Sequence, residues 1–209
     1  MTAIFSPRTS KKPDAARMRS ISSTRASAKT VSAPCATGAS RESETTMTSP
    51  FDDRLDKMGI VLPEPAAPVA SYVPAMAVGE LLFVSGQIPV ASETLVKGIV
   101  GGAPWSDVPA LTLEEGKEAA KICAINLLAQ VKAYLGGSLS DLVGCVKLGG
   151  FVACGPDFRD QPAVINGASD FMIDVMGDAG RHTRFAVGAP SLPLGVAVEI
   201  DGIFRIKQS

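Results

Sequence analysis

The chain has 209 residues, of which 46% are hydrophobic and 20% charged, so it can bury a sizeable core in one domain or two small ones. Residues 1–46 carry a net charge of +5 and residues 47–209 a net charge of −6. The acidic second part excludes a general basic field for nucleic acid, and no apolar run reaches the roughly 18 residues that a membrane span needs. We therefore expect neither nucleic acid nor a membrane as a partner.

The cysteines and the histidine bear on metal binding. Cysteines stand at positions 35, 123, 145 and 154 without a CxxC pair, and His182 is the one histidine of the sequence. This is not the ligand set of a zinc site. Cys123 and Cys145 lie within apolar segments, which favours buried thiols in a reducing cytosol.

Residues 1–46 are rich in Ser, Thr, Ala and Arg and have almost no apolar periodicity, so we predict a disordered basic tail. Two alternatives stay open. The segment is poor in acidic residues, as a transit peptide would be. It could also be an over-extended gene start, because Met47 opens the sensible sequence MTSPFDDRLDKMGI.

Residues 47–70 are expected to be a lead-in, in which DDRLDKMGI predicts a short helix and LPEPAAPVA a Pro-rich stretch. The main domain is expected over residues 71–207. It opens with SYVPAMAVGELLFVSGQIPV, two apolar runs joined at Val78-Gly79-Glu80 in the pattern of a hairpin. Residues 91–111 contain several Gly and Pro residues and predict a strand fragment and a loop.

The clearest helix pattern covers residues 113–135. Thr112 and Glu115 have the spacing of a capping box, and Gly136-Gly137 ends the apolar repeat. The run LVGCVKLGGFVAC (142–154) has no helical period and predicts a strand.

A second helix is predicted to follow Asp160 as N-cap. Its apolar face consists of Val164, Ala168, Phe171, Met172 and Val175. The segments TRFAVGA and PLGVAVEIDGIFRI then predict two strands. The order ββ(β)αβαββ indicates an α+β domain with one sheet whose helices pack on one face. No predicted element is left for the other face, so we expect that face to be covered by oligomerisation.

Two charged residues are candidates for chemistry. Arg184 starts a predicted strand after a Gly-rich turn, and a guanidinium there can bind a carboxylate with two parallel hydrogen bonds. Glu199 shares a strand face with Asp201, where a carboxylate could orient or deprotonate a water. From the residues alone, the simpler alternatives are favoured: a surface arginine at a strand end, and a polar strand face that meets solvent.

Five further residues belong either to a site or to the fold alone. His182 could be a general base or a solvated loop residue. In the segment Ser85-Gly86-Gln87 the glycine either allows close approach to a ligand or makes a turn. Asn166 and Gly167 both disfavour a helix interior, which hints at a functional compromise. Tyr72 stands between apolar residues and fits a core position.

No GxSxG motif, P-loop or GxGxxG after a strand occurs, so the motifs name no reaction. Taken in order, however, three segments resemble the RidA/YjgF family of reactive-intermediate deaminases. They are SYVPAMAVGELLFVSGQIPV, FRDQPAVINGASDFM and TRFAVGAPSLPLGVAVEIDGIF, which are similar to the family's SGQ-(I/L)-P hairpin, its helical asparagine segment and its terminal arginine-to-glutamate signature. The resemblance covers about two thirds of the chain, from Ser71 to Ile206.

The resemblance implies the chorismate-mutase-like fold, a mixed sheet with two helices on one face, and homotrimers with active sites in clefts between subunits. It also implies a hydrolase that converts 2-imino acids to 2-oxo acids and ammonia without metal or cofactor. Arg184 would clamp the substrate carboxylate, Glu199 would hold the attacking water, and the backbone carbonyl of Ala186 would accept a hydrogen bond from the imine nitrogen. The rest of the pocket would be formed by Tyr72, Ser85, Gly86 and Asn166.

The sequence departs from the family pattern at several places. Ala186 stands where many members have cysteine, residues 91–111 make a longer connection, and Arg181 and His182 could enlarge the anion site. The alternatives are a non-catalytic trimer that binds small carboxylates or acts as a regulatory or chaperone-like partner, and an endoribonuclease, a label that some relatives carry. The acidic body and the single histidine argue against RNA cleavage. The expected location is the cytoplasm, or mitochondria if residues 1–46 are a transit peptide.

Overall fold

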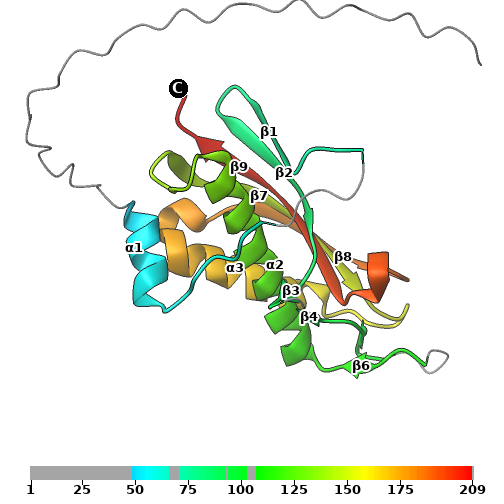
Figure 1. Ribbon diagram of the computed structural model, residues 1–209. Coiled ribbons are helices and arrows are strands. Elements are labelled where there is room, and N and C mark those ends of the chain that lie inside the picture. Colours follow the sequence, from blue (N-terminus) through cyan, green and yellow to red (C-terminus); the bar gives the residue numbers. More distant parts are fainter. Residues whose placement is uncertain (1–48, 66–70, 93, 103–106, 209) are drawn as a thin grey trace, which may run out of the picture. The chain divides into compact units, whose positions relative to one another are not determined.

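Five strands form one mixed sheet in the order β1-β2-β9-β7-β8 (Figure 1). The strands are β1 Ala75–Val78, β2 Leu81–Gln87, β7 Leu142–Ala153, β8 Thr183–Ala189 and β9 Val198–Ile206. The computed structural model describes residues 49–65, 71–92, 94–102 and 107–208, and the predicted tail 1–46 lies outside them. The hairpin β1-β2 and the strands β7, β8 and β9 confirm the predicted strands.

The sheet is mixed because β7 and β8 run parallel, whereas its other strand pairs are antiparallel. Parallel neighbours need a crossover connection, and here a helix supplies it: α3, Gln161–Met176, lies between β7 and β8 in the sequence. Since β8 stands at the end of the strand order, it is an edge strand. Arg184 therefore begins an edge strand that α3 supports on one face.

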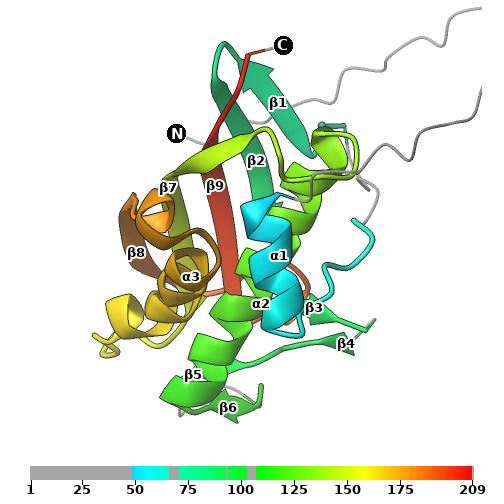
Figure 2. The same ribbon diagram turned by 90° about the vertical axis from the view of Figure 1, so that its left-hand side faces the viewer.

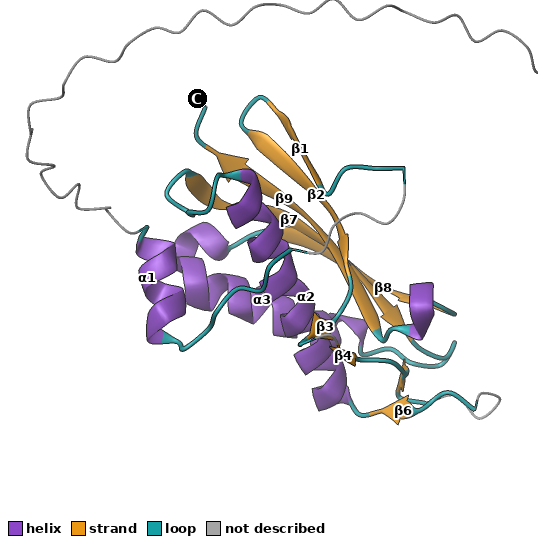
Figure 3. Cartoon of the chain, in the orientation of Figure 1, coloured by secondary structure: helices purple, strands orange, loops and turns teal. Residues whose placement is uncertain are grey.

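Three α-helices lie on the same side of this sheet, as Figures 2 and 3 show. They are α1 Pro50–Lys57, α2 Leu113–Tyr134 and α3. The capping box of Thr112 and Glu115 at α2 is confirmed, and Gly136 follows the helix with φ +80°. The expected two-helix layer is incomplete, because α1 of the lead-in also packs against α2 and α3.

The core lies between the sheet and the helices. The predicted apolar face of α3 is confirmed, because Val164, Ala168, Phe171, Met172 and Val175 are all buried. Each buried large apolar side chain contributes about 1.5–3 kcal/mol through its removal from water. The sheet contributes fully buried side chains that point toward the helices from alternate positions of the central strands, among them Leu82, Leu148, Val152, Val198, Ile200 and Phe204.

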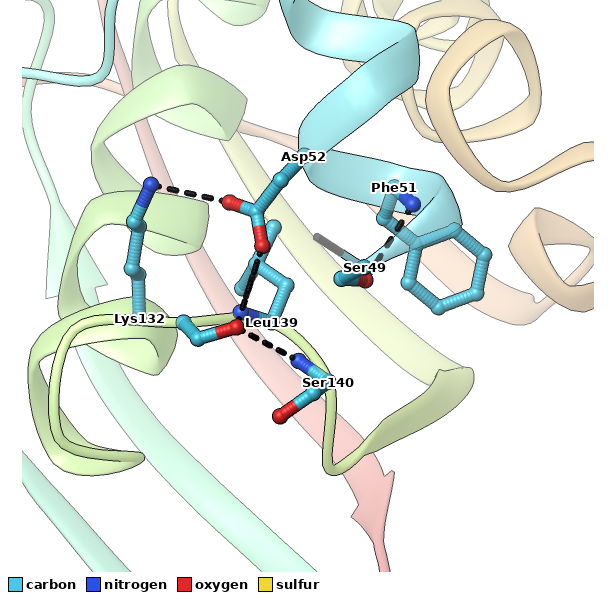
Figure 4. A network of polar contacts seen from close by, with 7 residues as sticks. Ser49, Phe51, Asp52, Lys132, Leu139 and Ser140 are labelled. Atoms are coloured by element: carbon cyan, nitrogen blue, oxygen red, sulfur yellow. Dashed lines mark hydrogen bonds and ion pairs between the residues drawn. The ribbon is translucent and has the colours of Figure 1, made fainter. Parts of the chain in front are cut away.

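A buried aspartate attaches α1 to the rest of the domain (Figure 4). Asp52 Oδ2 accepts a hydrogen bond from the backbone N–H of Leu139 at 2.9 Å, and Asp52 Oδ1 lies 2.8 Å from Lys132 Nζ. Ser49 accepts a hydrogen bond from the N–H of Phe51 and so caps the same helix. A buried carboxylate is stable when it is paired and hydrogen-bonded in this way. The lead-in helix is therefore packed into the domain and is not a loose extension.

Two predictions at the sheet margin need correction. Residues 91–111 contain short strand pairs, β3 Val90–Ala91 with β4 Thr94–Leu95 and β5 Ile99–Val100 with β6 Ala110–Leu111, in place of one strand fragment and a loop. The last strand begins at Val198, because Pro193–Gly195 forms a 3-10 turn that includes Leu194 at φ +57°. A proline and a residue in the left-handed region cannot continue an extended strand.

The face of the sheet opposite the helices carries exposed apolar side chains. They belong to β1, β2, β7 and β8, and each is more than a third exposed: Met76, Val78, Phe83, Phe151 and Val187.

Among the described residues, no helix is both long and apolar enough to cross a bilayer. The predicted burial of Cys123 and Cys145 is confirmed.

Candidate functional site

Arg184 extends from β8 along α3. Its Nη1 donates a hydrogen bond to Ser169 Oγ at 2.8 Å, and its Nη2 donates to the carbonyl oxygen of Pro162 at 3.1 Å. These two bonds use one N–H of each terminal nitrogen and leave a second N–H on each. The guanidinium is therefore fixed against α3 and still has the paired donors that a carboxylate needs.

Asn166 belongs to the same part of the site. Residues 162, 166 and 169 follow one another at spacings of four and three, so they share one face of α3. Asn166 is exposed and lies between the two α3 residues that Arg184 binds. Arg184 therefore binds the face of α3 that also carries Asn166. Ala186, two residues beyond Arg184 on the same face of β8, is half-buried and pairs with Gly150 of β7.

The interpretation of His182 as a solvated loop residue is wrong, because the ring is half-buried and both of its nitrogens have partners. His182 Nε2 lies 3.1 Å from Ser169 Oγ, and its Nδ1 lies 2.6 Å from the carbonyl oxygen of Gly180. Burial and the nearby charge of Arg184 lower the pKa of His182, against the Gly180 carbonyl, which raises it. Arg181 is exposed and pairs with Asp178 at 3.1 Å.

Glu199 lies against Gly86. A Cβ added to Gly86 would stand 2.3 Å from Glu199 Oε1, so a larger residue in β2 would require this carboxyl group to move from its present place. The group that lies close to Gly86 in the structure is a side chain of the protein itself, so the predicted approach of a ligand stays a prediction. Burial, and secondly the charge of Asp201, raise the pKa of Glu199 above its ordinary value of 4.5.

Tyr72 and Ser85 lie on the Glu199 side of the molecule. Tyr72 is half exposed, which overturns its interpretation as a core residue. Ser85 Oγ donates a hydrogen bond to the carbonyl oxygen of Val73 at 2.9 Å and so holds the Tyr72 segment against β2. Both residues line a shallow recess together with Met76, Phe83, Asp201 and Ile203.

The candidate residues fall on two opposite faces of the sheet. A Cβ at Gly149 would meet Asp201 and Phe185, so Asp201 and its face-mate Glu199 point to the open face. Arg184, next to Phe185 in the same strand, points the other way and binds α3. Within one chain, therefore, the group of Arg184, Asn166 and Ala186 does not meet the group of Glu199, Gly86, Ser85 and Tyr72.

The sequence and the fold both match known proteins. Residues 52–201 match the model of the family described as "YjgF/chorismate mutase-like, putative endoribonuclease". The chain belongs to the YjgF/chorismate-mutase-like family. Protein TCP17 of Trypanosoma cruzi is 42% identical to it over 155 residues, which cover 73% of this chain and 92% of that protein.

Two solved structures support the same family membership. The protein Atu1372 with unknown function from Agrobacterium tumefaciens is 45% identical, with a TM-score of 0.66 over 76% of this chain and 93% of that chain. A putative endoribonuclease from Shewanella oneidensis MR-1 is 30% identical, with a TM-score of 0.67 over 76% of this chain and 100% of that chain. The resemblance on the three segments is thereby confirmed, and the α+β architecture is that of the YjgF family.

Two residues of the site region were missed or misread from the sequence. Ser169 binds both Arg184 and His182 and was not singled out, although its spacing of three from Asn166 places it on the same helix face. The sequence pattern suggests that Gly167, like Asn166, stands in a helix for the sake of function. Gly167 is a packing residue, because a Cβ there would stand 2.0 Å from the backbone oxygen of Lys117 in α2.

Glu199→Gln is expected to raise the melting temperature slightly at pH 7.5. A raised pKa means that the folded state binds the proton more tightly than the unfolded state, so ionisation of Glu199 costs stability as the pH rises above 4.5. Because Glu199 is only half-buried, we expect a gain of about 1–3 °C that disappears near pH 4. Thermal unfolding at both pH values measures it, with Glu118→Gln at an exposed position of α2 as control. A lower melting temperature of the Glu199 variant at pH 7.5 would contradict the expectation.

Proposed function

We propose that this protein hydrolyses small 2-imino acids to 2-oxo acids and ammonia. The observation that carries the proposal is the state of Arg184: two bonds to α3 fix the guanidinium, and one N–H remains on each terminal nitrogen. Such a pair of donors matches a substrate carboxylate. The family membership supports the same conclusion.

The chemistry follows from the second group of residues. A 2-imino acid carries an electrophilic carbon, so the enzyme has mainly to orient substrate and water. Glu199, held against Gly86 with its pKa raised, accepts a proton from the attacking water. The water oxygen bonds to the imine carbon while the π bond of C=N breaks, and the nitrogen takes up the proton that Glu199 received. In the resulting carbinolamine the hydroxyl proton passes through Glu199 to the nitrogen, the C–N bond breaks as the C=O bond forms, and ammonia and the 2-oxo acid are released. The carbonyl oxygen of Ala186 would accept a hydrogen bond from the imine nitrogen.

We further propose that the site forms between subunits of a homotrimer. Arg184 and Glu199 point to opposite faces of the sheet, so one chain alone does not assemble both halves around one substrate. The exposed apolar side chains on the open face give a second reason, because a monomer rarely leaves such a face to water. Packing that face against a second copy would bring the Glu199 group of one subunit toward the Arg184 group of another.

The family description and one relative carry an endoribonuclease label. We do not extend that activity to this chain, because residues 47–209 have a net charge of −6 and the open face carries Glu199 and Asp201. A phosphate backbone binds to basic surfaces, and RNA readout commonly uses stacked aromatic side chains.

The test generates 2-iminobutanoate in situ with an amino-acid oxidase and traps the surviving imine with semicarbazide. Wild-type protein is expected to lower the trapped fraction, and Arg184→Ala is expected to abolish this effect. Equal trapping with and without high concentrations of folded wild-type protein would refute the deaminase. In that case, thermal stabilisation by small carboxylates would indicate a binding protein on the same scaffold, since a ligand at one hundred times its Kd adds about 2.7 kcal/mol.

A further inference from the structure

A chain of hydrogen bonds leads from the backbone of Gly180 through His182 and Ser169 to Arg184. We propose that His182 and Ser169 are positioning residues that hold the Arg184 guanidinium in the orientation that receives a carboxylate. The inference rests on the proposed role of Arg184 as the carboxylate clamp and assigns a role to its two neighbours.

The direction of each hydrogen bond in this series from Gly180 to Arg184 follows from the two groups at its ends, a carbonyl oxygen and a guanidinium. The carbonyl oxygen of Gly180 can only accept, so His182 Nδ1, at 2.6 Å, carries the proton. In the neutral ring His182 Nε2 is then an acceptor, and the hydroxyl hydrogen of Ser169, at 3.1 Å, points to it. The lone pairs of Ser169 Oγ remain for Arg184, which can only donate.

The backbone after α3 brings these groups together. The 3-10 turn η1, Gly177–Gly180, folds the chain back along the helix it has just left. A Cβ at Gly180 would stand 2.2 Å from the carbonyl oxygen of Met172, so only glycine permits this contact. Ser169 is buried, with 8% of its surface exposed, and lies one turn before Met172 on α3. The hydroxyl is therefore held in a fixed place between His182 and Arg184.

The chain of bonds requires a neutral imidazole. If His182 were protonated, Nε2 would donate, and two cations would then share the oxygen of Ser169 while its hydrogen lost its acceptor. Burial and the charge of Arg184 both keep the ring neutral by lowering the pKa of His182. Of the other charged groups on the neighbouring elements, Asp178 pairs with Arg181, and Lys147 lies over the Phe185 ring on the opposite face of the sheet.

Nuclear magnetic resonance can test the bond pattern, because the sequence contains one histidine and its imidazole signals need no assignment. A two-bond ¹H–¹⁵N spectrum of the full chain at pH 7.5 is expected to show a protonated Nδ1 and an unprotonated Nε2. Titration is expected to give a pKa of His182 below 6.5, which rises in Arg184→Gln because the charge of Arg184 is one cause of the lowering. A protonated Nε2 in the wild type would overturn the proposal.

Two variants at one position test the effect on Arg184. Ser169→Ala is expected to weaken 2-oxobutanoate binding about fivefold, since it removes one hydrogen bond to a charged group. Ser169→Thr keeps the hydroxyl and is expected to bind within about twofold of wild type. Unchanged affinity in a folded Ser169→Ala protein would refute the positioning role. If the alanine variant does not fold, the proposal is still tested by the His182 tautomer of the wild type and by the 2-oxobutanoate affinity of Ser169→Thr.

These outcomes are separate from the fate of the deaminase. The ligand is a 2-oxo acid and no turnover is needed, so the positioning role of His182 and Ser169 can be established in a protein that hydrolyses no imine. Conversely, imine hydrolysis with unchanged KM in Ser169→Ala would leave the proposed deaminase activity intact and contradict the positioning role of Ser169.

Discussion

Arg184→Ala and Glu199→Gln chains, each inactive alone, are expected to regain about a quarter of the wild-type activity per site when they are unfolded and refolded together in equal amounts. In random trimers, a site built from two subunits receives an intact arginine half and an intact glutamate half in one case of four. The expectation follows from the opposite directions of the two side chains, one toward α3 and the other across Gly86 on the open face. The imine-trapping assay measures the recovery.

The control for this experiment mixes Arg184→Ala with Arg184→Gln. Both defects then lie in the same half of the site, so refolding produces no intact site and no activity should return. If the Arg184 and Glu199 variants also fail to complement while forming oligomers of normal size, each site lies within one chain. The two-face description of the site would then be wrong.

Gly167→Ala is expected to destabilise the fold by about 3 kcal/mol, which lowers the melting temperature by roughly 6–12 °C. The new methyl group would stand 2.0 Å from Lys117 O and 2.8 Å from Lys117 C, which are backbone atoms of α2. A backbone contact cannot be relieved by a rotamer change, so α2 and α3 would have to move apart. Thermal unfolding monitored by circular dichroism measures the effect.

Gly116→Ala in α2 is the matched control. Its added Cβ would meet Val100 Cγ2 at 3.1 Å, which is a side-chain contact that small shifts can relieve. The gain of up to about 1 kcal/mol from replacing a helical glycine offsets part of that cost. We expect a net change within about 1 kcal/mol. Equal destabilisation by both variants would show that loss of glycine in general, and not the α2–α3 contact, sets the effect.

The described part of residues 91–111 contacts the main sheet in a way that the sequence pattern did not predict. Its strand β5 forms a parallel bridge from Val100 to Cys154 at the end of β7, and Lys97 bridges Val196 before β9. Ile99 of β5 lines a cavity together with Cys154, Gln161 and Gly188. This segment therefore packs against the end of β7 and beside the start of β9, the strand that carries Glu199.

The sequence alone determined the elements and the family. A capping box and helical spacing predicted α2 and the buried face of α3, because local hydrogen bonds and the 3.6-residue period depend on neighbours in the chain. Alternation along the last strand placed Glu199 and Asp201 opposite Val198, as observed. Three segments in the family's order, the last of which contains Arg184 and Glu199 at the expected interval, indicated the family to which the chain belongs.

Only the tertiary structure decided how the site is arranged. Alternation cannot be carried from Arg184 to Glu199, since the 3-10 turn Pro193–Gly195 interrupts the extended chain between them. The roles of Gly86 and Gly167 depend on side chains or backbone fifty or more residues away in sequence. The contact of Ser169 with His182 exists because the chain turns back at Gly180. Local patterns specify secondary structure, whereas the faces that side chains share depend on long-range packing.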